Sequence, residues 1–133
     1  MNQTYTLHVA GVTRELPMMN VSANVTIASF VILGDVEIVK ATAPLLAKRL
    51  PEVDVIVSAE AKGIPIAHEV AASLGMNRYY VARKSVKAYM GEPLIQTVQS
   101  ITTSEEQMLC FDENDARAIC GKRVAIIDDV IST

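Results

Sequence analysis

The sequence predicts an α/β domain in which helices flank a mostly parallel central sheet. Two observations support this class: short apolar segments are typical of buried strands, and the segments between them carry apolar residues at helical spacing. Alternation of strands and helices favours parallel pairing through right-handed crossovers. The chain has 133 residues, of which 50% are hydrophobic, so it can form a core of useful size. We therefore expect one domain, with an irregular N-terminal region at 1–33 and an α/β core at 34–133.

The N-terminal part of the chain has β-forming residues without a clear period. Residues 4–33 incline towards β-structure, and Gly11 and Pro17 should interrupt it. Asp35 can then cap a helix. The apolar face of this helix keeps helical spacing through Val39, Ala43, Leu46 and Leu50. Pro44 lies inside the helix and should kink it or delay its start.

The middle of the chain alternates between strand and helix. An apolar strand is expected at 53–57, and Pro65 suits the first turn of the helix that follows it. That helix should end at Gly75. Its inward face is expected to consist of Ile64, Ala67, Ala71 and Leu74. The next strand is expected at 79–82.

Three further strands are expected in the remainder of the chain. Segments 94–103 and 107–111 alternate loosely, and they can pair as a hairpin around 104–106. The run at 124–128 is apolar up to its final aspartate, which is typical of a buried strand in a parallel sheet. This is the last strand that the sequence predicts.

Two loops that follow predicted strands carry the residues best suited to a binding site. Asp128 and Asp129 lie beyond the last strand, where ligands bind in open α/β sheets. In the loop 60–63, Gly63 lets an anion approach the backbone at a helix N-terminus and Lys62 adds a positive charge. The alternatives are a helix N-cap beside a solvated carboxylate and an ordinary strand-to-helix turn. We expect both loops at the same edge of the sheet.

A basic cluster follows the strand at 79–82. Arg83, Lys84 and Lys87 would suit a ligand with several negative charges, and an arginine can hold two phosphate oxygens at once. The alternative for such a cluster is a solvated surface.

Composition excludes several classes of function. The net charge is −3, so no overall basic field favours nucleic acid as a partner. No apolar run approaches the roughly 18 residues of a membrane span, and the polar segment 1–5 is unlike a signal peptide. Cys110 and Cys120 have neither redox nor metal-ligand spacing, and we expect them to be reduced. A cytoplasmic protein without nucleic-acid or membrane partners is predicted.

The segment 124–133 resembles the phosphoribosyl-pyrophosphate (PRPP) signature of type I phosphoribosyltransferases. That signature is a hydrophobic strand followed by two aspartates, two apolar residues, a small residue and threonine. The resemblance extends from about Phe30 to Thr133 and is closest to the adenine and xanthine enzymes, especially at 82–84 and 98–107. It implies transfer of the phosphoribosyl group of PRPP to a purine base, which gives a nucleoside 5′-monophosphate and pyrophosphate for purine salvage.

The resemblance also implies roles for individual residues. Asp128 and Asp129 would be catalytic, because they would bind the ribose hydroxyls beneath the positive charge that develops on the ring. Ser132 and Thr133 would begin the cradle for the 5′-phosphate. Mg²⁺ would be the cofactor, and it would be held mainly by PRPP.

Pyrophosphate would be bound by the two remaining loops. The residues implied are Ala61, Lys62, Gly63, Arg83, Lys84 and Lys87. An unusual cis peptide would lie near Ala61 and Lys62. The Arg83–Lys84 pair would reach the pyrophosphate of a neighbouring subunit, which implies a homodimer.

The sequence departs from the family where the base should bind. Adenine enzymes carry a Glu-Tyr pair in a mobile loop, whereas here 101–103 is Ile-Thr-Thr, unless Glu105 or Glu106 replaces the acid. Xanthine enzymes have an asparagine shortly after a phenylalanine, whereas here Phe30 is followed by 31–33, Val-Ile-Leu. Phe30 can stack on a base, or it can belong to the core. The base is left open, and a non-catalytic domain that senses PRPP or purines is the alternative function. A remnant that only dimerises is a third.

The family motif continues with Gly-Gly-Thr, a helix and further strands, and the present sequence reaches only Thr133. We therefore expect that C-terminal elements are missing and that the chain is a fragment of a longer polypeptide, with a natural remnant as the alternative. The phosphate cradle should be incomplete, and the chain ending at Thr133 should show no measurable transfer.

Overall fold

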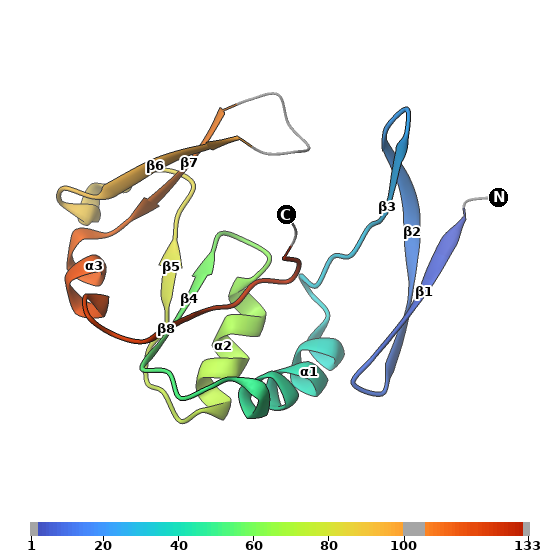
Figure 1. Cartoon of the computed structure of the whole chain (residues 1–133), viewed down its shortest axis with the longest axis horizontal. Coiled ribbons are helices and arrows are strands. Elements are labelled where there is room, and N and C mark those ends of the chain that lie inside the picture. The colour runs from blue at the N-terminus through green and yellow to red at the C-terminus, as the bar shows by residue number, and fades with distance from the viewer. Residues whose placement is uncertain (1–2, 100–105, 132–133) are drawn as a thin grey trace.

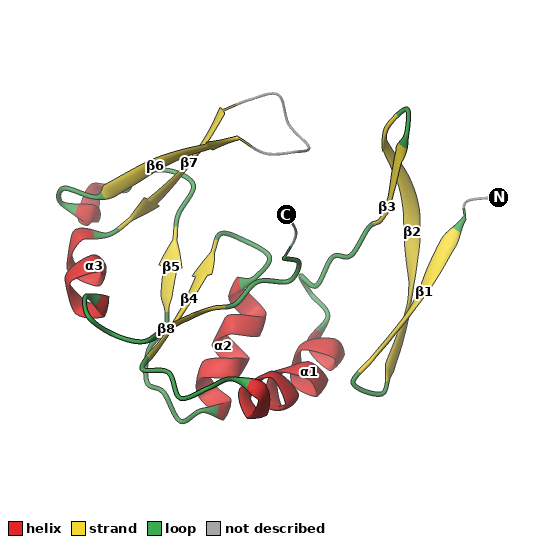
Figure 2. Cartoon of the chain, viewed as in Figure 1, coloured by secondary structure: helices red, strands yellow, loops and turns green. Residues whose placement is uncertain are grey.

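The computed structural model describes residues 3–99 and 106–131, and within them it has three helices of the α type and three sheets (Figures 1 and 2). The central sheet has the order β5-β4-β8, with β4 at Val55–Ala59, β5 at Tyr80–Ala82 and β8 at Val124–Ile126. Both pairs of neighbours are parallel. The predicted α/β class with a parallel central sheet is confirmed.

The N-terminal region is a regular antiparallel meander, so the predicted inclination towards β-structure is confirmed and only the predicted irregularity is wrong. Strands β1 (Thr4–Val9), β2 (Val12–Ser22) and β3 (Val25–Ala28) pair in that order. The turn from β1 to β2 places Gly11 at a φ of +77°, which explains why glycine is found there.

Pro17 does not break this meander, contrary to prediction. It is the last residue of β2 that pairs with β1, opposite Thr4. From Met18 onwards β2 pairs with β3 instead. The missing N–H of proline therefore falls where β2 changes partners, and the Pro17 carbonyl still accepts a hydrogen bond from Ser29 N at 2.8 Å.

Helix α1 (Val36–Arg49) begins where the sequence predicts, because the Asp35 carboxylate accepts a hydrogen bond from Ile38 N at 3.1 Å. Arg14 of β2 donates to both oxygens of Asp35, at 2.7 and 2.9 Å. The bidentate pair ties the meander to the start of α1. Pro44 lies inside the helix, and the predicted late start is wrong.

Helix α2 (Ile64–Ser73) packs between β4 and α1. Pro65 lies in its first turn, and Gly75 follows its end at a φ of +72°, as the sequence predicts. The predicted inward face is only half right: Leu74 is exposed and Ile64 only partly buried. The buried residues are Ile66, Ala67, Val70 and Ala71. A helix packed against both a sheet and a second helix buries a wider stripe than one contact requires.

The predicted burial of the last strand is also corrected. Ala125 and Ile127 are buried, whereas Val124 and Ile126 are 40% and 70% exposed. Strand β8 pairs with β4 on one side and directs alternate side chains towards the core, so only every second residue is covered. Strand β4 begins two residues later than predicted.

The hairpin predicted near the end of the chain is present. Strands β6 (Leu94–Gln99) and β7 (Glu106–Phe111) pair antiparallel, and the predicted turn at 104–106 lies largely outside the described residues. Two short elements were not predicted: η1 (Ala88–Met90) and α3 (Glu113–Ile119).

Two further findings bear on the sequence predictions. Cys110 is buried and Cys120 is exposed, and neither forms a disulfide. In the part of the chain that is described, no helix has the length and apolarity needed to cross a membrane.

Candidate functional site

The carboxyl ends of β4 and β8 bring the two predicted loops into contact. A Cβ placed on Gly63 would lie 2.6 Å from Asp128 Oδ1 and 2.5 Å from the hydroxyl oxygen of Ser58. Both distances are far below van der Waals contact, so only glycine allows the loops to approach this closely. The aspartates and the loop 60–63 therefore share one edge of the central sheet, as the sequence predicts.

Lys62 and Asp129 form an ion pair across this junction. The Lys62 Nζ lies 3.7 Å from Asp129 Oδ2, which is longer than a hydrogen bond. The Lys62 side chain is 50% exposed, whereas that of Asp129 is only 6% exposed. Among the described residues, Asp129 Oδ2 has no hydrogen-bond partner, and neither does the buried hydroxyl of Ser58. Buried oxygens without partners are what a bound polar ligand or cation would satisfy.

Asp128 is held in an environment that disfavours its negative charge. Burial raises the pKa of Asp128, and the neighbouring Asp129 carboxylate raises it further. Lys62 and the hydrogen bond from Asp129 N at 2.9 Å act in the opposite direction. An incoming positive charge would therefore be stabilised at this point more strongly than beside a solvated carboxylate.

The loop before α2 presents backbone donors at the same junction. Within the described residues, the N–H groups of Ala61, Lys62 and Gly63 donate to no backbone or side-chain acceptor. Consecutive free N–H groups at a helix N-terminus favour an anion. The peptide between Glu60 and Ala61 is cis, close to Ala61 and Lys62 as the family resemblance implies.

The basic cluster after β5 is organised by Glu60, a residue to which the sequence analysis assigned no role. Arg83 Nε and the backbone N–H of Lys84 both donate to Glu60 Oε2 at 3.0 Å. Arg83 also donates to the Tyr89 hydroxyl at 2.8 Å. The hydrogen bonds from Arg83 and from the Lys84 N–H lower the pKa of Glu60, and that from Arg83 is the largest cause. No local pattern could have predicted the pair, because its members are 23 residues apart in sequence.

The other predicted site residues are less informative. The Nζ of Lys87 donates a hydrogen bond to Ser85 Oγ at 2.7 Å and not to Glu60. Ser132 and Thr133 lie outside the described residues, as do 101–103 and Glu105. Glu106 is the first residue of β7 and is exposed.

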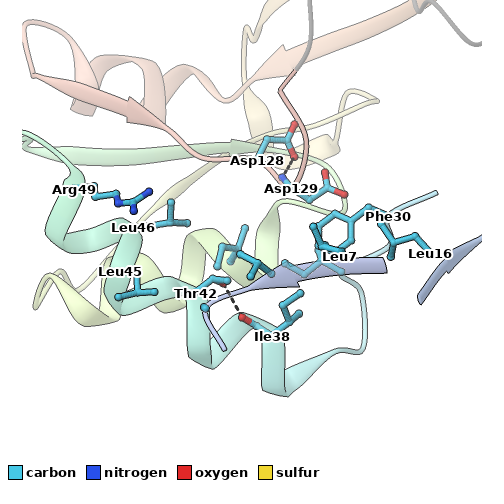
Figure 3. Close-up of a pocket in the computed structure, with 14 residues that line it drawn as sticks. Leu7, Leu16, Phe30, Ile38, Thr42, Leu45, Leu46, Arg49, Asp128 and Asp129 are labelled. Carbon is cyan, nitrogen blue, oxygen red and sulfur yellow. Dashed lines mark hydrogen bonds between the residues drawn. The ribbon is translucent and has the colours of Figure 1, made fainter. Parts of the chain in front are cut away.

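A cavity of about 490 Å³ opens beside the aspartates, between the meander and α1 (Figure 3). Asp128 and Asp129 line it together with Phe30, the residue proposed to stack on a base. In Figure 3, Phe30 lies towards the end that carries Asp129, and Arg49 lies towards the other end. Apolar side chains form most of the wall: Leu7, Val9, Leu16, Ile32, Ile38, Leu45, Leu46 and Ile66. Phe30 is thus part of the cavity wall and also packs against the core.

Among the described residues, the carboxylates nearest this junction that could contact a cation are those of Asp128 and Asp129. The described residues contain no cluster of three or more His, Cys, Asp or Glu side chains able to hold a metal ion. The oxygens of Asp128 and Asp129 are the donor type that Mg²⁺ prefers, and Asp129 Oδ2 is free to accept.

Comparison with known proteins identifies the fold. The sequence matches no protein-family model, and no curated protein is significantly similar to it. Among solved structures, the crystal structure of adenine phosphoribosyltransferase from Thermoanaerobacter pseudethanolicus is similar, with a TM-score of 0.66 and 21% sequence identity. The similarity covers 89% of this chain and 68% of that chain. The chain therefore has an α/β fold like that of a phosphoribosyltransferase.

Proposed function

We propose that this protein transfers the phosphoribosyl group of PRPP to a purine base, giving a nucleoside 5′-monophosphate and pyrophosphate. One observation carries the proposal: Gly63 brings the aspartate pair and the loop with Lys62 into contact at one sheet edge. A cation and free N–H groups there face a pair of carboxylates, and an apolar cavity with Phe30 adjoins them. The similarity of fold to an adenine phosphoribosyltransferase supports this assignment.

The chemistry follows from the charges at the junction. The pyrophosphate would accept hydrogen bonds from the backbone of 61–63 and contact Lys62, which leaves the ribose ring above Asp128 and Asp129. As the bond to pyrophosphate breaks, positive charge develops on the ring. A partly desolvated Asp128 stabilises that charge more in the transition state than in the ground state.

Mg²⁺ fits this arrangement as a cofactor shared with PRPP. When bound, it would neutralise charge on the pyrophosphate. Mg²⁺ would be held mainly by oxygens of PRPP, with the protein adding at most one or two carboxylate oxygens.

We also propose that the protein forms a homodimer in the cytoplasm. Arg83 and Lys84 would contribute to pyrophosphate binding in the partner subunit. Glu60 would hold the guanidinium of Arg83 in position through Nε, so that the remaining N–H groups of Arg83 can donate to the ligand. Crosslinking or sedimentation of the protein would test the assembly directly.

Two titrations test the binding site in parts. Calorimetry with Mg²⁺ and PRPP should show binding that Asp128→Asn and Asp129→Asn each weaken by at least about tenfold, because each removes a charged acceptor. The same two substitutions should weaken the binding of pyrophosphate much less, since pyrophosphate lacks the ribose that the aspartates would contact. Lys62→Met should weaken the binding of both PRPP and pyrophosphate. Lys122→Met, an exposed lysine just before β8, is the matched control and should weaken neither.

A transfer assay separates the enzyme from the sensing domain. Adenine, guanine, hypoxanthine and xanthine would each be supplied with PRPP and Mg²⁺, and release of pyrophosphate would be measured. Turnover of any of them supports the enzyme. Tight PRPP binding without turnover of any base, by this chain and by a version extended past Thr133 through the family motif, would favour the sensing domain. Absence of PRPP binding would contradict both.

A further inference from the structure

We propose that the cavity between the meander and α1 binds an acceptor heterocycle that carries an apolar substituent. This inference rests on the proposed function and adds the chemical class of the acceptor. The heterocycle would lie near Phe30 and the aspartates, and the substituent would extend along α1 towards Arg49.

The size of the cavity exceeds what an unsubstituted purine needs. Its volume of about 490 Å³ lies within the range of roughly 300–1,000 Å³ that is typical of sites for drug-sized ligands. Adenine has ten non-hydrogen atoms and would leave much of this space unfilled. A larger ligand would therefore make more contacts without any rearrangement of the wall.

The shape of the cavity indicates where the additional group would lie. Ile38, Thr42, Leu46 and Arg49 follow one another along the same face of α1. From Ile38 to Arg49 the helix rises by about 16 Å, which is longer than a purine ring system. The Thr42 hydroxyl donates to Ile38 O at 2.7 Å, so its hydrogen is already used inside the helix. This wall consequently offers mainly apolar contacts.

Two leucines of the wall are poorly covered by the protein itself. Leu45 is 45% exposed and Leu46 is 37% exposed, although both line the cavity. An apolar ligand would remove this surface from water, and the gain is roughly proportional to the area covered.

The opposite wall is held in place before a ligand arrives. Leu7, Val9 and Leu16 of the meander form it. The bidentate pair between Arg14 and Asp35 joins this meander to α1. Because the two walls are linked, the cavity is largely preformed, which lowers the cost of binding.

A homologous series of ligands tests the proposal without PRPP. Adenine and a set of N6-alkyladenines, from methyl to hexyl, would be titrated into the protein by calorimetry. We expect affinity to rise by roughly three- to fourfold for each methylene group that becomes buried. An affinity that does not change with the length of the alkyl chain would overturn the proposal.

A matched pair of variants locates the effect. Leu46→Glu should abolish the gain with chain length, because it places a carboxylate on the apolar wall. Leu74→Glu should retain the gain, since Leu74 is 38% exposed and does not line the cavity. Thermal melting would verify that both variants fold. The proposal would be overturned if affinity rose with chain length in Leu46→Glu as it does in the parent. It would also be overturned if Leu74→Glu reduced this rise as much as Leu46→Glu does.

Two outcomes distinguish this inference from the proposed function. If PRPP binds but the affinity for the adenines does not depend on alkyl length, only the proposed apolar substituent is ruled out. A dependence on alkyl length without PRPP binding would overturn the phosphoribosyl transfer instead. If Leu46→Glu converts a dimer to a monomer and the series shows no gain, a second copy of the chain covers this wall and the proposal is wrong.

Discussion

The two ends of the parallel sheet hold aspartates in opposite electrostatic conditions. At the amino ends, Asp54 precedes β4 and accepts three hydrogen bonds from Arg123, at 2.8, 3.1 and 3.0 Å. They lower the pKa of Asp54 to about 2, and the side-chain bonds are the largest cause. At the carboxyl ends, Asp128 follows β8, and burial beside Asp129 raises its pKa.

This difference separates a structural carboxylate from a candidate functional one. The Asp54–Arg123 pair lies at the surface and has its acceptors filled, so it links β4 to β8 and has little left to offer a ligand. Asp128 and Asp129 are crowded and incompletely partnered, which costs stability but leaves oxygens available. Charges that are unfavourable in the free protein are typical of binding and catalytic sites.

The largest effect is expected from Gly63→Ala. The added Cβ would overlap Ser58 Oγ and Asp128 Oδ1, and its distance to the Asp128 Cα would be only 3.1 Å. Because the backbone itself must move, we expect the free energy of unfolding to fall by about 1–3 kcal/mol. We expect the affinity for PRPP to fall by about a hundredfold or more. Denaturation and calorimetry measure the two quantities.

Gly121→Ala is the control for that substitution. Gly121 has open space around it but a φ of +72°, so alanine there should cost about 1 kcal/mol of stability without any effect on the ligand. If Gly63→Ala bound PRPP as tightly as Gly121→Ala, close contact between the loops would not be required for binding.

A smaller effect, of opposite sign at the two ends of the sheet, is expected from removal of the aspartate charges. Asp128→Asn should raise the melting temperature at neutral pH, because it relieves a charge that burial and Asp129 disfavour. Asp54→Asn should lower the melting temperature, because it breaks the pair with Arg123. Calorimetric melting of both variants and the parent measures the shifts, and shifts of the same sign would contradict the comparison.

Another small effect concerns Glu60. Glu60→Gln should weaken pyrophosphate binding by a few-fold, because Arg83 and the Lys84 N–H lose a charged acceptor and become less ordered. Glu52→Gln, which contacts Arg123 at the other end of the sheet, is the control and should leave pyrophosphate binding unchanged. Tighter binding by Glu60→Gln would instead mean that Glu60 competes with the ligand for Arg83.

The smallest expected effect is a pH dependence with opposite slopes. The folded-state pKa of Asp54 is about 2, below its ordinary value of 3.8, so its contribution to stability is present above about pH 4 and is lost as pH falls towards 2. The pKa of Asp128 is raised, so its cost is absent at low pH and appears as pH rises above 3.8. Melting curves of the parent against each variant from pH 2 to 7 would show the two trends. A difference between the parent and Asp54→Asn as large at pH 2 as at pH 7 would contradict this assignment.

The sequence by itself determined the elements that depend on local chemistry. The cap at Asp35, the start of α2 near Pro65 and the glycine after it act through neighbouring residues, and all three are as predicted. The shared edge of Lys62 and Asp128 was also predictable, because the carboxyl ends of parallel strands meet at one edge.

Only the tertiary structure decided the features that join distant parts of the chain. The ordered meander depends on pairing between strands, and the place of Pro17 in it depends on where β2 changes partners. Which face of β8 is buried depends on where α1 and α2 pack, because Ala125 and Ile127 join their core whereas Val124 and Ile126 point away from it. The pair between Glu60 and Arg83 joins residues whose spacing has no local signature. Each is set by long-range contacts, and these compete successfully with local propensity because burial and pairing involve larger energies.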